Sequence, residues 1–192
     1  MARDVHHIAS AYSATGVGSV IGNKGGLVVR LSVGQTSIAF CSCHLAAHEG
    51  ATHLSSRNHM CQEILRETSG RKIGGTRGRG RPLDVAHAVD HTIWLGDLNY
   101  RLDMKLIDRP DLCGSSAKHA RVAAVSQMCA EGQYAELQRA DELRHARANG
   151  ESFVNFVEGS MAFPPTFKVQ RKAGTQYVHS HGTPWGSTPN AL

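Results

Sequence analysis

The sequence predicts an α/β layered sandwich, and three stretches of the chain support that prediction. Residues 27–33 alternate between apolar and polar side chains, and residues 36–45 form a second extended run. Residues 55–67 then follow with helical spacing of their apolar side chains. Strands come first and helices lie between the later strands, which is typical of a layered α/β sandwich.

The first two strands are expected to form a β-hairpin. Every second residue from Leu27 to Val33 is apolar and shares one face, while Arg30 and Ser32 lie on the other face. Gly34 and Gln35 supply the turn. Residues 36–45 are nearly apolar on both faces, so this strand is expected at the centre of a covered sheet.

Later elements follow from the same patterns. Met60 and Ile64 are expected to face inward from the helix at 55–67. Further expected elements are a buried strand at 92–99, helices at 117–130 and 134–148, and a short strand at 153–157. A Gly- and Arg-rich stretch at 70–82 predicts a flexible loop, and residues 173–192 predict a disordered tail beyond one domain at 1–172.

Composition restricts the class of protein. The formal net charge of +5 favours anionic partners such as phosphates or an acidic membrane face. No run reaches the roughly 18 apolar residues of a membrane span, and residues 1–10 contain no apolar signal-peptide core. Five cysteines without a disulfide spacing indicate reduced thiols, so we expect a cytoplasmic protein with peripheral contact to anionic membranes.

The strongest chemical signal lies at the end of the strand at 92–99. Asp97 and Asn99 are two residues apart, and in an extended strand they project to the same side. A carboxylate can polarise an attacking water, and an amide can orient it, while Gly96 leaves space for a substrate. The same residues also fit an ordinary Asp/Asn turn.

Two histidines lie at and just after the end of the expected strand at 36–45. His44 can donate to a phosphate oxygen or protonate a leaving group, and His48 follows four residues later. A satisfied buried histidine and a zinc pair are the alternatives. Against zinc, strand alternation puts Cys43 on the opposite side from His44, and no second ligand pair has finger-like spacing.

Two further segments carry cations. Asn23 and Lys24 lie in a Gly-Asn-Lys-Gly-Gly string, where backbone N–H groups can cradle an anion. Lys168 follows a rigid Pro164-Pro165 turn. A glycine turn and a solvated surface lysine are the plainer readings of these segments.

These segments, in this order, resemble the inositol polyphosphate 5-phosphatases. The resemblance rests on Trp-x-Gly-Asp-x-Asn-Tyr-Arg at 94–101, Gly-Asn-Lys-Gly-Gly, His-Leu-Ala-Ala-His and an Arg-Asn pair at 57–58. It implies the four-layer α/β sandwich of the endonuclease/exonuclease/phosphatase type and magnesium-dependent removal of a 5-phosphate from phosphoinositides or inositol polyphosphates. It implies catalytic roles for His44, Asp97 and Asn99, and substrate-binding roles for Asn23, Lys24, His48, Arg57, Asn58, Tyr100, Arg101 and Lys168.

The sequence also departs from this family. The asparagine and the metal-holding glutamate of the family's first strands would precede this sequence, and the Pro-x-Trp-Cys-Asp-Arg signature that should follow Lys168 is replaced by an unrelated tail. Phe167 stands where the family usually has tyrosine, and Ser42-Cys43 where it usually reads Asn and Ser. We therefore expect a domain incomplete at both ends, without its own metal ligands and with negligible activity by itself.

Two other functions remain open from the residues. A non-catalytic module would keep the phosphate-contacting groups and bind phosphoinositides. RNA binding through Arg71, Lys72 and the arginines of the Gly/Arg-rich stretch is the other, although that stretch has no aromatic residue for base stacking. We do not expect nucleic acid as the partner.

Overall fold

The computed structural model describes residues 4–15, 23–68, 72–73 and 84–167. The predicted loop at 70–82, apart from residues 72 and 73, and the predicted tail at 173–192 lie outside the described residues. Two compact units divide the chain: residues 1–100 with 149–154, and residues 101–148 with 155–192. In chain order the elements are β1 (Val5–Ala14), β2 (Gly25–Val33), β3 (Thr36–His44), α1 (Ala51–Glu67), α2 (Val85–Ala88), β4 (His91–Asp97), 3₁₀ turns η3 (Met104–Ile107) and η4 (Pro110–Leu112), α3 (Lys118–Ala130), α4 (Tyr134–Arg139) and α5 (Glu142–Ala148).

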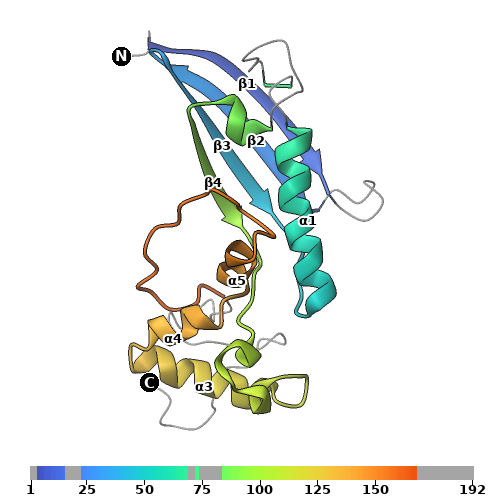
Figure 1. Ribbon diagram of the computed structural model, residues 1–192, viewed down its shortest axis with the longest axis vertical. Coiled ribbons are helices and arrows are strands. Elements are labelled where there is room, and N and C mark those ends of the chain that lie inside the picture. Colours follow the sequence, from blue (N-terminus) through green and yellow to red (C-terminus); the bar gives the residue numbers. More distant parts are fainter. Residues whose placement is uncertain (1–3, 16–22, 69–71, 74–83, 168–192) are drawn as a thin grey trace. The chain divides into compact units, whose positions relative to one another are not determined.

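The first unit is built on one sheet with the strand order β1-β2-β3-β4 (Figure 1). The β1/β2 and β2/β3 pairs are antiparallel, and the β3/β4 pair is parallel. The predicted hairpin of β2 and β3 is confirmed, with a turn in which Gly34 has φ 57°. The parallel pair needs a crossover, and the chain makes it through α1 and α2.

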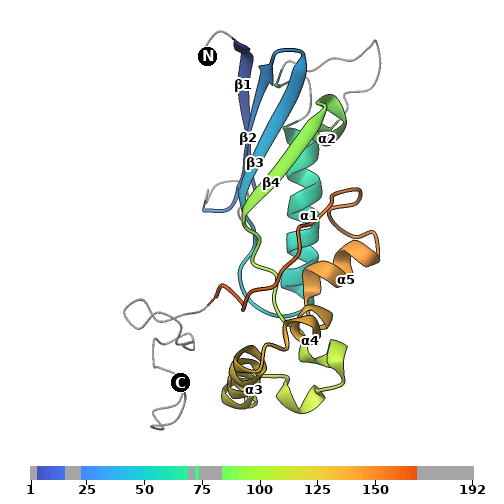
Figure 2. The same cartoon turned by 90° about the vertical axis from the view of Figure 1, so that its left-hand side faces the viewer.

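Helix α1 covers one face of the sheet, as the views in Figures 1 and 2 agree. Met60 and Ile64 of this helix are buried, as predicted. At Gly26, an added Cβ would lie 2.7–2.9 Å from side-chain atoms of Ile64, so only glycine lets β2 approach the helix this closely. Val28 and Ser32 are buried on the same side of β2.

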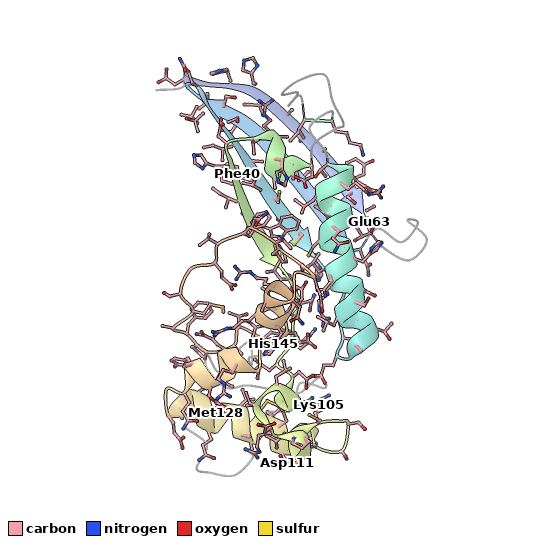
Figure 3. All side chains as sticks on the ribbon, viewed as in Figure 1. Phe40, Glu63, Lys105, Asp111, Met128 and His145 are labelled. Atoms are coloured by element: carbon pink, nitrogen blue, oxygen red, sulfur yellow. The ribbon has the colours of Figure 1, made fainter. Side chains whose placement is uncertain are left out.

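The opposite face of the sheet is apolar and exposed. Phe40, labelled in Figure 3, is 37% exposed, and Ile8 is 68% exposed. The alternation predicted for 27–33 is present, but its apolar set lies on this exposed face. Strand register aligns Val29, Phe40 and Ile93 in one row across it, and Tyr12, Leu27, Ser42 and Leu95 in the next.

The second unit has a small core of its own. Met104, Leu112 and Ala140 are buried together, with Val125 and Met128 of α3 packed against them. The predicted helix at 134–148 is two helices, because the chain breaks at Asp141, whose carboxylate accepts a hydrogen bond from the Leu143 N–H at 2.8 Å. The strand predicted at 153–157 is wrong: Phe153 and Asn155 have φ values of 50° and 68°, which no strand allows.

Among the described residues, no helix has the length and apolarity required to cross a bilayer.

Candidate functional site

The candidate site lies at one end of the sheet, where β2 begins and β3 and β4 end. Register pairs Gly25 with His44 and His44 with Asp97, so the start of β2 and the ends of β3 and β4 meet at the same edge of the sheet. The Leu45 N–H donates to the Asp97 carbonyl at 2.9 Å and continues the ladder past this row. This row follows the two apolar rows on the exposed face, because side chains two residues apart share a face.

His44 has two charged neighbours at one nitrogen. Its Nε2 lies 3.4 Å from Asp97 Oδ2 and 3.0 Å from Lys24 Nζ. The side chains of His44 and Asp97 are 50% and 60% exposed, so a solute can reach them. An imidazole, a carboxylate and an ammonium in contact, open to solvent, can hold an anion and move a proton.

Asn99 joins this group through a turn. Strand β4 ends at Asp97, two residues before the predicted end, and Asn99 has φ 57°. The extended geometry predicted for Asp97 and Asn99 is therefore wrong, although the two residues are in contact. The Asn99 N–H donates to Asp97 Oδ1 at 3.1 Å, and the Asn99 side-chain Nδ2 donates to the Leu45 carbonyl at 3.1 Å.

Gly96 does not leave room for a substrate, contrary to the prediction. A Cβ at this position would lie 2.1 Å from the Cys43 carbonyl oxygen and 2.6 Å from the Cys43 nitrogen, and Gly96 has φ 124°. The space beside Gly96 is filled by the backbone of β3. The glycine is needed so that β4 can pair closely with β3 next to the site.

The Gly-Asn-Lys-Gly-Gly string also serves packing. At Gly25 a Cβ would lie 2.2 Å from the Ser13 carbonyl oxygen of β1. The Thr15 N–H donates to the Lys24 carbonyl at 3.1 Å. The backbone of Lys24 is thus tied to β1, while Asn23 beside it is exposed. A cradle of backbone N–H groups for an anion stays a prediction.

Arg57 is placed beneath the site. Its side chain is fully buried, and one terminal nitrogen donates to the carbonyls of Ala46 at 3.2 Å and His48 at 2.8 Å. Its guanidinium also lies 5.3 Å from the ring centroid of Tyr100. Arg57 therefore fixes the loop that follows His44, and its direct contact with substrate stays a prediction.

Asn58 and Tyr100 tie the segment at 149–154 to α1. The Tyr100 hydroxyl donates to Asn58 Oδ1 at 2.7 Å and lies 3.1 Å from Ser152 Oγ, while Asn58 Nδ2 donates to Glu151 Oε2 at 3.0 Å. Burial is the main cause of a raised Tyr100 pKa, so the phenol stays neutral. Sequence patterns gave no signal for Glu151 and Ser152, because they lie far from these partners in the chain.

Three further residues, His48, Arg101 and Lys168, were predicted to bind substrate. The His48 ring lies 5.3 Å from that of His53, which was not predicted, and His48 has φ 76°. Arg101 belongs to the second unit, where its guanidinium lies 5.5 Å from the ring centroid of Phe167. Lys168 lies outside the described residues.

The thiols beneath the site are neutral. Cys43 is buried, as the predicted alternation requires, and accepts a hydrogen bond from Trp94 Nε1 at 3.1 Å. Burial raises the pKa of Cys41 and of Cys43 to about 12, and that of Cys61 to about 11. Among the described residues, no group of three or more His, Cys, Asp or Glu side chains could hold a metal ion, which gives no support to the zinc interpretation.

The residues at this site do not form a complete magnesium centre. Magnesium prefers oxygen ligands from carboxylates together with waters and substrate phosphate. Asp97 supplies one carboxylate, and within residues 4–15, 23–68, 72–73 and 84–167 no group of three or more His, Cys, Asp or Glu side chains could hold a metal ion.

Comparisons with known proteins agree with the fold. The profile of the endonuclease/exonuclease/phosphatase family 2 matches residues 1–185. Phosphatidylinositol 3,4,5-trisphosphate 5-phosphatase 2B of Danio rerio is 33% identical over 175 residues, which are 91% of this chain and 12% of that protein.

Among solved structures, the inositol polyphosphate 5-phosphatase domain of SPsynaptojanin, in complex with inositol (1,4)-bisphosphate and a calcium ion, matches with a TM-score of 0.62 and 25% identity. The match covers 92% of this chain and 43% of that domain. A Cimex nitrophorin in its ferrous NO complex, 13% identical with a TM-score of 0.56, shares the fold alone. The predicted α/β fold class is confirmed, and the described residues contribute one sheet and its helix layer.

Proposed function

Because the chain belongs to the endonuclease/exonuclease/phosphatase family 2, we propose that its His44–Asp97 row is part of a phosphomonoesterase site for the 5-phosphate of phosphorylated inositols. One observation carries the proposal: Lys24, His44 and Asp97 come from three strand ends and meet at Nε2 of His44. The chain spans 12% of the length of the Danio rerio relative and 43% of the solved domain. The phosphatase activity is therefore proposed for the complete enzyme and not for these residues alone.

Each residue has a role in the proposed reaction that its contacts support. Lys24 Nζ and, when it carries a proton, His44 Nε2 donate to the phosphoryl oxygens and stabilise the charge on them, because both atoms lie in the exposed part of the site. Asp97 accepts a proton from the attacking water, since its Oδ2 faces His44 in the exposed part of the site. Asn99 holds Asp97 Oδ1 through its backbone N–H, and orientation of the water by its amide is the further role we propose.

The substrate class follows from charge and from the relatives. The row combines a lysine and a histidine in a chain of net charge +5, which favours a multiply phosphorylated ligand. The Danio rerio relative is named for a phosphatidylinositol trisphosphate, and the solved domain holds an inositol bisphosphate. We propose a phosphoinositide or soluble inositol polyphosphate as substrate, a cytoplasmic location, and peripheral contact with anionic membranes.

Magnesium is the cofactor that we propose for the complete enzyme. When bound, it would supply Lewis-acid stabilisation of the phosphoryl oxygens. Since the described residues gather too few ligands, we expect the 192-residue chain to release little phosphate even with added magnesium. Clear turnover that disappears in Asp97→Ala would contradict this expectation.

Binding of soluble inositol phosphates tests the proposed function without requiring turnover. Amide and imidazole NMR signals of the purified chain would be followed while inositol 1,4,5-trisphosphate or inositol 1,4-bisphosphate is added. We expect the 5-phosphorylated ligand to shift the signals of Gly25, His44 and Leu45 at lower concentration. His44→Gln should weaken its binding by about tenfold, which corresponds to about 1.4 kcal/mol.

A matched control lies on the same strand as Asp97. His91 is exposed at the other end of β4, so His91→Gln should leave binding unchanged. Equal affinity for the two ligands, or equal loss in both variants, would refute a site for the 5-phosphate at this row. Tighter binding of a single-stranded RNA at the same residues would support the nucleic-acid function instead.

A further inference from the structure

Lys24 and Asp97 approach the same nitrogen of His44. The distances to Nε2 are 3.0 Å from Lys24 Nζ and 3.4 Å from Asp97 Oδ2. An ammonium group only donates hydrogen bonds, and a carboxylate only accepts them. One ring nitrogen cannot satisfy both, because it carries a proton when it donates and a lone pair when it accepts.

The distances decide between the two partners. The Lys24 contact lies within the usual range of a hydrogen bond, whereas the Asp97 contact lies beyond the usual 2.7–3.2 Å for N–H···O. We propose that Lys24 is a positioning residue that holds His44 in the tautomer with its proton on Nδ1 until a phosphate arrives. This inference rests on the proposed function, since it concerns the same site.

The doubly protonated form of His44 fits this arrangement poorly. An imidazolium with a proton on Nε2 would place a second positive charge 3.0 Å from the Lys24 ammonium. Like charges at that separation repel even where solvent screens them. The neutral ring, with Nε2 accepting from Lys24, removes this repulsion and leaves Asp97 Oδ2 next to a group that does not donate to it.

The attachment of Lys24 to the sheet lets its ammonium move alone. Its carbonyl accepts the Thr15 N–H, and the next residue, Gly25, lies against Ser13 of β1. The backbone is therefore fixed, while Nζ sits at the end of a flexible four-carbon chain. Nζ can turn to a phosphate oxygen without disturbing the pairing of β1 and β2.

Departure of Lys24 releases His44 Nε2. The ring then loses the proton on Nδ1 to solvent and gains one from solvent on Nε2, so the number of bound protons is unchanged. Nε2 now donates, either to Asp97 Oδ2 or to a phosphate oxygen. One lysine thus binds the anion and, by the same movement, converts His44 from an acceptor into a donor.

Long-range nitrogen-15 NMR of the histidine rings in the 192-residue chain tests the inference. In the wild type at a pH where His44 is neutral, we expect the Nδ1–H tautomer in excess by roughly tenfold, as one charge-assisted hydrogen bond gives. Lys24→Met should shift the ring to the Nε2–H tautomer, and Lys24→Arg should restore Nδ1–H because it still donates. A wild-type ring with Nε2–H, or no change in Lys24→Met, would overturn the inference.

Titration with inorganic phosphate separates this inference from the proposed function. In the wild type, phosphate should move His44 to Nε2–H in step with the amide shifts of Gly25 and Leu45, and in Lys24→Met the tautomer should not change further. Amide shifts that saturate while the wild-type tautomer stays Nδ1–H would overturn the release step alone. If no amide responds to phosphate, the anion site itself is refuted, whatever the tautomer.

Discussion

At the scale of single residues, the site depends on backbone positions that side-chain periodicity does not report. Asn99 takes a left-handed conformation and uses both its backbone N–H and its side-chain amide to join Asp97 to Leu45. After glycine, asparagine is one of the residues that best tolerate this conformation. Asn99 therefore stabilises the site in two ways: its side chain bonds the chain after β3, and its left-handed backbone forms the turn after β4.

Substitutions at Asn99 separate these two contributions. Asn99→Gly keeps the conformation and loses the hydrogen bond to the Leu45 carbonyl, so it should lower the free energy of unfolding by about 1 kcal/mol. Asn99→Ala adds the cost of a Cβ at φ 57°, for a loss of about 2 kcal/mol in total. Urea denaturation measures both, and equal losses would show that backbone strain plays no part.

Sequence reasoning found His44, Asp97, Asn99 and Lys24 because polar residues at strand ends stand out against apolar strands. It missed how they meet, since strand alternation gives no information on the turn at Asn99. The resemblance also gave Arg57 and Tyr100 substrate-binding roles. In the structure Arg57 is buried against a half-buried Tyr100, whose hydroxyl contacts Asn58 and Ser152. Such contacts follow from tertiary packing and leave no local pattern.

At the scale of elements, the hairpin and the core-facing residues of α1 were predictable because their periodicity is strong. Strand β1 was missed, since VHHIASAYSA places histidines and serines on both faces and its register is irregular between His6 and Ala9. The end of β4 was placed two residues late because Leu98 and Asn99 continue the sequence pattern after pairing has stopped. These errors share one cause: strand pairing, unlike hydrophobicity, is decided by partners elsewhere in the chain.

The pairing of β3 with β4 gives a prediction at this scale. Gly96→Ala puts a Cβ 2.1 Å from the Cys43 carbonyl oxygen at a φ of 124°, so the strands must separate beside the site. We expect a loss of about 3 kcal/mol or more in the free energy of unfolding. Hydrogen exchange at the Leu45 amide, which donates to the Asp97 carbonyl, should also become faster.

Gly34→Ala is the matched control. Gly34 also has a positive φ, of 57°, but an added Cβ there meets nothing within 4 Å. It should cost about 1 kcal/mol and leave Leu45 exchange unchanged. Similar effects of the two substitutions would mean that conformational strain, and not contact with β3, explains the requirement for glycine at position 96.

At the scale of the whole molecule, the exposed face of the sheet is the dominant feature beside the site. Tyr12, Leu27, Phe40, Ile93 and Leu95 are between 37% and 75% exposed and lie in neighbouring rows of one face. Contiguous apolar surface of this kind promotes association, because burying it removes it from water. His44 and Asp97 occupy the next row of the same face, so association would take place beside the site.

We therefore expect the purified chain to bind a hydrophobic dye and to increase in average mass with concentration in sedimentation experiments. The double variant Ile8→Thr with Ile93→Thr should weaken both effects, because threonine keeps the strand preference while reducing the apolar area. Val28→Thr, on the buried face against α1, is the control: it should lower stability without reducing association. If the wild type stays monomeric and binds no dye, or if Val28→Thr reduces association as much as the double variant does, the exposed face is not what drives association.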